Sequence, residues 1–397
     1  MKRKIMARVY RCVSADSHLE ISPNRWRDRV PEQYRERAPR AIRLPNGGDA
    51  IIAENKPLLP LFQHNSGVPW EEWGHDRPRR WENSAGAGTP QQRLADIDLD
   101  GVDAEILFPG VSGWGMWSGI ADHDAYCAVA SAYNEFIAEE YMAAAPDRFI
   151  PVGVMPDRGV ARAIAELEHC KRLGLKAIAL DAFPNGSLTP KPEDDEFWSA
   201  ALDLDMPLTV HTQFSRMRDG RGGGGLDLAR RISTYGVKAA PIAMQLAIHG
   251  VFERLPKLQL YFAENEVGWI PNFLEQADIL WERQRFYHER MQGLKPLDRK
   301  PSEYVKAHCS WGFMDNRVGV ELRHHIGVDH MMWSTDFPHD PSDWPHSQDV
   351  ITRNFAGVPE DEKQAIVAGN AVRYFHLDED GALPEKNSGR VAEPLRT

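Results

Sequence analysis

Four polar residues of metal-binding type stand at the ends of short apolar runs. Asp16 and His18 lie in SADSHLE, His211 lies in LTVHTQF, and Asp336 lies in MWSTDFPHD. Two imidazoles and two carboxylates suit a borderline divalent cation. A single Asp or His at a strand end is more often a turn former or a helix cap. The conjunction of all four predicts one shared site with one divalent metal, zinc first, with manganese or iron as alternatives.

Three further residues are placed to assist such a site. Glu20 is either a third ligand or a carboxylate that orients His18, and an ion pair with a nearby arginine is the alternative. His339, three residues after Asp336, is expected to contact substrate or shuttle a proton, unless it caps the next helix. Glu264 follows LQLYFA and should either hold substrate or pair with a buried arginine. The predicted catalytic residues are Asp336, His211, His339 and Glu264.

An arginine and a group of tryptophans have two interpretations each. Arg93 precedes a helical segment and either binds a substrate carboxylate or forms a salt bridge. The tryptophans either wall an aromatic ligand or form the core of an inserted segment. They are Trp70, Trp73, Trp81, Trp114 and Trp117.

The elements that must position these residues form a repeating pattern. Short apolar runs alternate with longer segments of helical periodicity, which indicates βα units and a parallel sheet. Eight such runs predict closure into a (β/α)8 TIM barrel, an α/β fold whose active sites gather at the carboxyl ends of the strands. The predicted strands are Val9–Ala15, Ala104–Phe108, Phe149–Val154, Lys176–Leu180, Pro207–Val210, Leu258–Ala263, Val305–Trp311 and His330–Ser334.

The segments between the runs predict an outer ring of helices and two long excursions. The helices are expected at Ala121–Ala144, Val160–Leu173, Asp194–Leu204, Trp269–Arg290 and Asn316–Ile326. Residues 21–95 are too long for a simple crossover and are interpreted as an insertion that caps the site. Phe214–Leu226, which contains RDGRGGGG, is expected to be a loop beside the site. Residues 1–397 would form one domain, with residues 378–397 as a polar C-terminal tail.

Composition excludes several classes of function. A formal net charge of -11 disfavours binding to nucleic acid or to anionic lipid. The absence of a long apolar stretch argues against a signal peptide or a membrane span, and four scattered cysteines suit a reducing compartment. We therefore expect a cytoplasmic enzyme that acts on a small molecule, and the sequence leaves a homodimer open.

The combined motifs resemble the amidohydrolase superfamily, in the branch that contains aminocarboxymuconate semialdehyde decarboxylase and the resorcylate-type decarboxylases. The resemblance covers about Val9–Phe375 and rests on DSHLEISPNRW, RLADIDLDGVDAEILFPG, LPKLQLYFAENEVGWIPNFLEQAD and HMMWSTDFPHDPSDWP. It implies that Asp16 and His18 take the paired ligand positions after strand one. By the same similarity His211 is the histidine of strand five and Asp336 the aspartate of strand eight.

Two departures from that family pattern bear on the reaction. The decarboxylases carry a histidine after strand six, where this chain has Glu264 or Asn265 in AENEVGWIP. The binuclear members bridge two metals with a lysine of strand four, and Lys176 precedes the corresponding run, so a single metal is expected. The first expectation is therefore a hydrolase that uses metal-activated water on an amide, ester or lactone of a small cyclic or aromatic carboxylic acid. A metal-dependent decarboxylase of an aromatic or muconate-type acid is the alternative.

Overall fold

The computed structural model describes most of the 397 residues. The described residues are 8–61, 64–74, 77–110, 114–212, 214, 237–340, 342–377 and 381–382. Within them, no helix is long and apolar enough to cross a membrane. The predicted loop after strand five therefore lies outside the described residues, except for Phe214, and so does most of the predicted tail.

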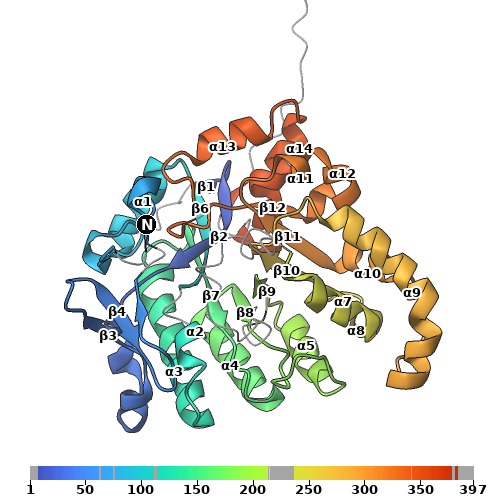
Figure 1. Cartoon of the computed structure of the whole chain (residues 1–397), viewed down its shortest axis with the longest axis horizontal. Coiled ribbons are helices and arrows are strands. Elements are labelled where there is room, and N and C mark those ends of the chain that lie inside the picture. The colour runs from blue at the N-terminus through green and yellow to red at the C-terminus, as the bar shows by residue number, and fades with distance from the viewer. Residues whose placement is uncertain are drawn as a thin grey trace, which may run out of the picture.

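Eight parallel strands form a nearly closed barrel, as predicted (Figure 1). Each strand pairs with the next strand along the barrel, because each βα unit returns the chain to the same end. Their side chains are almost entirely buried, which explains the uninterrupted apolar runs. The strands are β2 (Val13–Leu19), β6 (Ala104–Pro109), β7 (Phe149–Val154), β8 (Ala177–Leu180), β9 (Leu208–His211), β10 (Leu260–Ala263), β11 (Cys309–Phe313) and β12 (Met331–Trp333).

The barrel closes where the first strand meets the segment after the last. The amide of His18 donates to the carbonyl of Phe337 at 2.7 Å, and the amide of Asp336 donates to the carbonyl of Asp16 at 2.9 Å. These bonds join the chain around Asp336 to β2 directly. The seam of the barrel therefore holds three of the four predicted metal ligands together.

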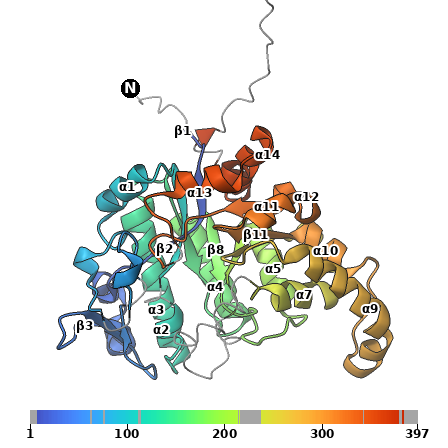
Figure 2. The same ribbon diagram turned by 45° about the horizontal axis from the view of Figure 1, so that its top comes forward.

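Helices surround the strands, as Figure 2 shows from a tilted view. The five predicted helical segments are all found, and most helices bury apolar residues against the barrel. They include α1 (Pro90–Leu99), α2 (Trp114–Trp117), α3 (His123–Phe136), α4 (Val160–Leu173), α5 (Asp194–Asp203), α7 (Ala240–Ile248), α8 (Val251–Arg254), α9 (Ile270–Gln292), α10 (Pro301–His308), α11 (Arg317–Glu321), α12 (Arg323–Ile326), α13 (Ser347–Asn354), α14 (Glu360–Gln364) and α15 (Asn370–Tyr374).

Several predicted boundaries are wrong for local reasons. The predicted strand Val305–Trp311 begins too early, because Pro301 starts α10 and this helix continues to His308. The predicted first strand Val9–Ala15 ends too early, because β2 continues through Leu19 after a register shift between Ser14 and Ser17. The predicted helix at Ala121–Ala144 changes to π-helical geometry at residues 137–142.

The predicted insertion has structure of its own. A three-stranded antiparallel sheet is formed by β3 (Arg40–Arg43), β4 (Asp49–Ile52) and β5 (Leu59–Pro60), and short 3-10 helices flank it. Two of these 3-10 helices, Arg27–Arg29 and Glu32–Arg37, contact α3, and Arg29 pairs with Glu139 of the π-helix after α3 at 2.5 Å. At the end of this segment Thr89 forms a capping box with Gln92 and starts α1, so the predicted insertion range overlaps that helix.

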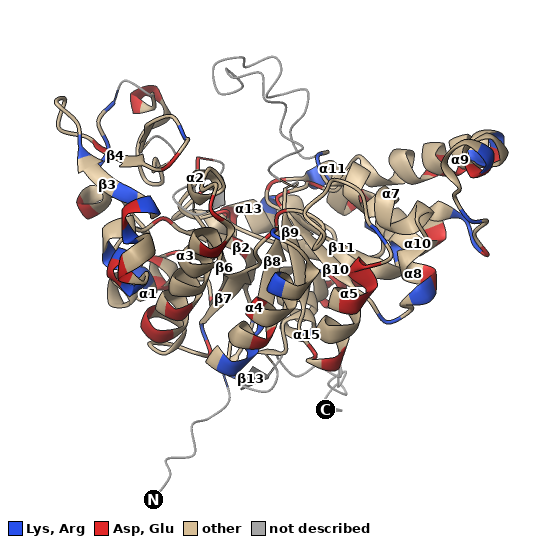
Figure 3. Ribbon diagram, turned by 90° about the horizontal axis from the view of Figure 1, so that it is seen from below, with Lys and Arg blue, Asp and Glu red and all other residues tan. Residues whose placement is uncertain are grey.

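Two outlying features complete the described chain. Helix α9 projects from the barrel in all three ribbon views, with charged residues along it (Figure 3). It also exposes Leu280, Phe286, Tyr287 and Met291. The short strand β1 (Arg8–Val9) pairs in parallel with β13 (Gly381–Ala382), which ties the two ends of the described chain together. A homodimer stays a prediction.

Candidate metal centre

The four predicted ligands converge at the carboxyl end of the barrel strands. One donor atom from each of Asp16, His18, His211 and Asp336 lies within 4.8 Å of every other. His18 Nε2 lies 3.0 Å from Asp336 Oδ1 and 3.5 Å from Asp16 Oδ1. His211 Nε2 lies 3.6 Å from Asp16 Oδ2. Residues from the first, fifth and eighth strands thus surround one point, as the sequence pattern predicts.

The donor atoms of this cluster lack ordinary partners. Both carboxylate oxygens of Asp16, Nε2 of His18 and Oδ1 of Asp336 are buried without a hydrogen bond of regular geometry to any described residue. Buried polar atoms normally have such bonds, because leaving them unmade costs about 1–3 kcal/mol each. A divalent cation would satisfy these atoms together, and imidazole with carboxylate is a donor set that suits such an ion. The residues therefore fit one bound divalent metal.

The imidazole of His18 is held in one orientation. Its Nδ1 lies 3.1 Å from the carbonyl oxygen of Pro109, at the end of the neighbouring strand β6. A bond from Nδ1 to a backbone carbonyl leaves Nε2 with its lone pair facing the cluster, which is the form that binds a metal. Pro109 follows Phe108, whose ring lies 5.2 Å from that of His211. An aromatic wall therefore stands beside the candidate ligands.

The backbone is strained where the strands end at this site. Asp336, Glu264 and Thr212 all have positive φ angles, of 54°, 51° and 48°. This left-handed region costs a non-glycine residue energy and persists only where surrounding contacts enforce it. It is concentrated here on the segments that follow β9, β10 and β12, which is a common property of functional sites.

His339 and Glu20 form a second layer of contacts. His339 Nδ1 lies 3.3 Å from Asp336 Oδ1, and its Nε2 lies 2.8 Å from Glu20 Oε1. The ring of His339 also stacks on that of His18, with centroids 3.8 Å apart. The other oxygen of Glu20 lies 3.2 Å from His64 Nε2, in the inserted segment. Glu20 therefore contacts His339 and His64 behind the cluster, rather than His18, which it is predicted to orient.

These contacts divide the acidic residues into two electrostatic classes. Burial, with the nearby charges of Asp336 and Glu264, raises the pKa of Asp16 well above its usual value. Burial acts in the same direction on Glu20, but hydrogen bonds from His339 and His64 outweigh it and hold the pKa of Glu20 well below its usual value. For Asp336 too, burial is outweighed by the charge of His339 and the close contacts with His18 and His339, so its pKa is lowered.

The pKa of His339 shifts in the opposite sense. Burial lowers it, but the charge of Asp336 and the hydrogen bonds to Asp336 and Glu20 outweigh burial and hold the pKa well above the usual histidine value. This shift favours the protonated form of His339 in the metal-free protein. The same burial lowers the pKa of His18, which keeps that imidazole neutral and able to ligate.

Glu264 lies at the cluster, and two other predicted groups do not. Glu264 Oε2 is 3.5 Å from His211 Nε2, so the residue after β10 reaches the site as predicted. The next residue, Asn265, turns away and donates to the carbonyls of Ala263 and Thr212. Lys176 precedes β8 and donates to the carbonyl of His376 at 3.2 Å, away from the ligand ends of the strands. Lys176 therefore does not lie beside the four candidate ligands, and a single metal stays a prediction.

Arg93 forms a structural ion pair. Its Nε lies 2.8 Å from Glu105 Oε2, and a second nitrogen lies 3.0 Å from Oε1, with both side chains fully buried. The same guanidinium donates to the carbonyls of His18 at 2.9 Å and Phe337 at 3.2 Å. Arg93 therefore holds the backbone at the barrel seam, and the salt-bridge interpretation is the correct one. Sequence reasoning missed Glu105, because nothing local links it to a residue twelve positions away.

The predicted tryptophan wall is not found among the described side chains. Trp117 is fully buried and packs edge-on against Trp26, with ring centroids 5.7 Å apart. Trp70 is 77% exposed, and Trp73 and Trp81 are half-buried. The side chain of Trp114 lies outside the described residues. The core interpretation therefore holds for Trp117, whereas Phe108 is the aromatic residue that contacts the site.

Comparison with known proteins gives a consistent picture. The chain is 25% identical to a gamma-resorcylate decarboxylase of Rhizobium sp. (strain MTP-10005) over 350 residues, which cover 83% of this chain and 99% of that protein. An amidohydrolase from Mycobacterium avium subsp. paratuberculosis K-10 has the same fold, with a TM-score of 0.73 and 17% identity over 92% of this chain and 99% of that one.

A 5-carboxyvanillate decarboxylase from Novosphingobium aromaticivorans, solved with manganese and 4-hydroxy-3-methoxy-5-nitrobenzoic acid, also shares the fold. Its TM-score is 0.67 at 18% identity, over 94% of this chain and 99% of that one. The amidohydrolase family matches residues 15–377, a range that includes all four candidate ligands. The chain is therefore a member of the amidohydrolase family, with a TIM barrel and a divalent metal site.

Proposed function

We propose that this protein is a metal-dependent, non-oxidative decarboxylase of a small aromatic carboxylic acid. The buried cluster of Asp16, His18, His211 and Asp336 is the observation that carries the proposal, because it offers one divalent cation two imidazoles and two carboxylates. The gamma-resorcylate decarboxylase to which the chain is similar is matched over 99% of its length. This support favours the decarboxylase over the hydrolase, which the sequence places first.

The site has the groups that such a reaction needs. A divalent cation bound there supplies a positive charge that holds and polarises the substrate carboxylate. Phe108, whose ring lies beside those of His211 and His18, gives an apolar surface for an aromatic ring. Asp16 and Asp336 would hold the divalent cation through two carboxylates, and His18 and His211 through two neutral imidazoles.

The proton for the ring carbon comes, in this proposal, from Asp336. Its Oδ1 lies 3.3 Å from Nδ1 of His339, whose pKa is held above the usual histidine value by Asp336 and Glu20. The proton passes from His339 through Asp336 to the ring carbon that bears the carboxylate. The bond between that carbon and the carboxyl carbon then breaks, carbon dioxide leaves, and the electron pair of the broken bond restores the aromatic ring. Glu20 holds the charge of His339 in place through the 2.8 Å contact.

The test is product analysis with metal-loaded protein. Hydroxylated benzoic acids are incubated in D2O, and carbon dioxide release and deuterium on the ring are measured. The proposal predicts carbon dioxide together with one deuterium on the carbon that lost the carboxylate. The Asp336→Asn variant should lose most of the carbon dioxide release and most of the deuterium incorporation. Conversion of the benzoic acid to a product without release of carbon dioxide would overturn the proposal.

Hydrolysis is the second candidate, and Glu264 favours it. A carboxylate 3.5 Å from His211 Nε2 stands where the similar decarboxylases carry a histidine, and it is 14% exposed. Such a group suits a general base that removes a proton from water. Esters, lactones and amides of aromatic acids tested on the same protein distinguish the two. Turnover of these without carbon dioxide release would establish the hydrolase instead.

The metal is proposed to be manganese or zinc. Carboxylate and imidazole together accept either ion. The manganese in the 5-carboxyvanillate decarboxylase structure supports the first, and the tetrahedral preference of zinc for nitrogen and oxygen donors supports the second. Activity after reconstitution of metal-depleted protein with each ion identifies the one that functions.

A further inference from the structure

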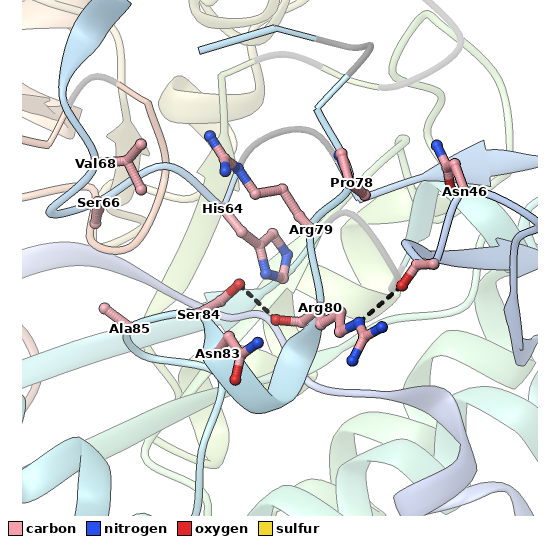
Figure 4. Close-up of a pocket in the computed structure, with 11 residues that line it drawn as sticks. Asn46, His64, Ser66, Val68, Pro78, Arg79, Arg80, Asn83, Ser84 and Ala85 are labelled. Atoms are coloured by element: carbon pink, nitrogen blue, oxygen red, sulfur yellow. Dashed lines mark hydrogen bonds between the residues drawn. The ribbon is translucent and has the colours of Figure 1, made fainter. Parts of the chain in front are cut away.

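A cavity lies within the inserted segment, and His64 links it to Glu20 behind the metal centre. It has a volume of about 260 Å³ and opens to solvent on one side. Figure 4 shows the ring of His64 in it, between Arg79 and the turn that carries Arg80 and Ser84. The residues that line it all come from this segment: Asn46, Gly47, His64, Ser66, Val68, Pro78, Arg79, Arg80, Asn83, Ser84 and Ala85.

Two buried polar atoms of this cavity have no partner among the described residues. His64 is 4% exposed, and its Nδ1 makes no hydrogen bond to them. Ser66 is 9% exposed, and its Oγ is in the same state. Buried donors and acceptors normally find partners, and both of these atoms belong to residues that line the same cavity. The opposite side of the His64 ring is already engaged with Glu20.

The charge of the cavity is positive. Among the described residues Arg79 donates only to neutral oxygens, namely Asn65 Oδ1 at 3.0 Å and the carbonyl of Glu72 at 3.0 Å. Arg80 is already compensated, because it lies 3.1 Å from the carboxylate of Glu82. None of the residues lining the cavity is an Asp or a Glu. One guanidinium charge is therefore left to attract a ligand.

We propose that this cavity binds a small organic carboxylate with a single negative charge. A planar guanidinium matches a planar carboxylate and binds it with charge-assisted hydrogen bonds. Arg79 supplies the charge, and Ser66 Oγ can donate its hydroxyl proton. His64 donates from Nδ1 when its ring carries both protons, because its Nε2 donates to Glu20. One uncompensated positive charge suits a monoanion better than the dianion of phosphate. The volume accommodates a molecule of about the size of benzoate.

The cavity is separate from the metal centre, but His64, which lines the cavity, contacts Glu20 behind that centre. His64, Glu20 and His339 lie in series between the cavity and Asp336. A ligand in the cavity therefore does not touch the metal, and the proposal does not depend on the reaction that the metal centre performs. A substitution of His64 would nevertheless remove a hydrogen-bond partner of Glu20.

The test is a calorimetric titration of the metal-loaded full chain with benzoate, and in parallel with inorganic phosphate. Four proteins are compared: wild type, Arg79→Gln, the control Arg77→Gln, and His211→Ala. Arg77 is exposed, lies two residues away and does not line the cavity, so it matches the change of charge. The His211→Ala variant removes a predicted metal ligand, so it separates benzoate held at the metal centre from benzoate held in the cavity.

Binding of benzoate that persists in His211→Ala and Arg77→Gln, and that weakens by about tenfold or more in Arg79→Gln, would support the proposal. Equal affinity in Arg79→Gln and Arg77→Gln would overturn it, and so would complete loss of benzoate binding in His211→Ala. Tighter binding of phosphate than of benzoate, lost in Arg79→Gln, would overturn the assignment of a carboxylate. A His64→Gln variant tests the second contact and should weaken benzoate binding while metal content stays unchanged.

Discussion

His339 Nε2 lies 2.8 Å from Glu20 Oε1, while the ring of His339 stacks on that of His18 at 3.8 Å. A residue behind the metal centre thus fixes a charged imidazole against a candidate ligand. Partners of this kind orient metal sites, and their removal commonly costs about 10-fold to 100-fold in affinity or activity. The contact between Glu20 and His339 can therefore be tested by substitutions that leave the four candidate ligands unchanged.

Replacing Glu20 by Gln should lower turnover by about 10-fold or more, because the amide no longer stabilises the positive charge of His339. Steady-state kinetics on the reconstituted enzyme measure the effect. Metal content, determined in parallel, should remain near that of the wild type, since Glu20 is not expected to ligate. Loss of the metal in this variant would instead make Glu20 a ligand.

Gly110→Ala perturbs Glu20 without changing it. An added Cβ at Gly110 would lie 2.5 Å from Cδ of Glu20 and 2.6 Å from its Oε2, so the carboxylate must move. We expect a drop in activity similar to that of the Glu20 variant. Gly115→Ala is the matched control, because its Cβ would meet nothing within 4 Å. Equal activity of the two variants would show that the position of Glu20 is not important.

Arg93→Met should destabilise the fold strongly. Removing one partner of a buried ion pair costs about 3–5 kcal/mol in the free energy of unfolding, since Glu105 is left with an uncompensated charge. Urea denaturation measures this change. Arg162→Met is the control, because Arg162 pairs with Asp124 on the surface, where such pairs contribute about 0–1 kcal/mol. A loss in Arg93→Met no larger than in the control would contradict the structural role of this pair.

Metal affinity should rise with pH. In the metal-free protein burial and the charges of Asp336 and Glu264 raise the pKa of Asp16 well above its usual value. Asp16 must lose its proton to ligate, so acid weakens metal binding, by up to about tenfold per pH unit for one proton released. Competition with a chelator across about pH 5 to 8 follows the affinity. A flat profile would mean that Asp16 is already ionised in the metal-free protein.

The candidate ligands could be predicted because the barrel fixes where strand ends lie. Asp16, His18, His211 and Asp336 each follow or end an apolar run, and parallel strands bring those ends to one face. The contact of His64 with Glu20 could not be predicted, because it joins the inserted segment to β2 across 44 positions with no repeating pattern. The start of β11 at Cys309, rather than at the predicted Val305, could not be predicted either. It depends on where α10 ends, and periodicity alone does not locate that residue.

The reaction was the least predictable part. Glu264 in place of a histidine after strand six led the sequence reasoning toward hydrolysis, whereas the similarity to decarboxylases over nearly their whole length supports the alternative. One barrel supports many reactions through changes in a few side chains, so the ligand set alone does not specify which bond is broken.

The most direct test of the account is a count of bound metal per chain. Elemental analysis is performed on the purified wild type and on the Asp16→Ala, His211→Ala and Asp336→Ala variants. The account predicts about one divalent ion per wild-type chain, lost together with activity in the three variants and regained by none of them on reconstitution at equal metal concentration. Wild-type protein that turns over substrate without metal, or variants that keep the ion, would contradict it.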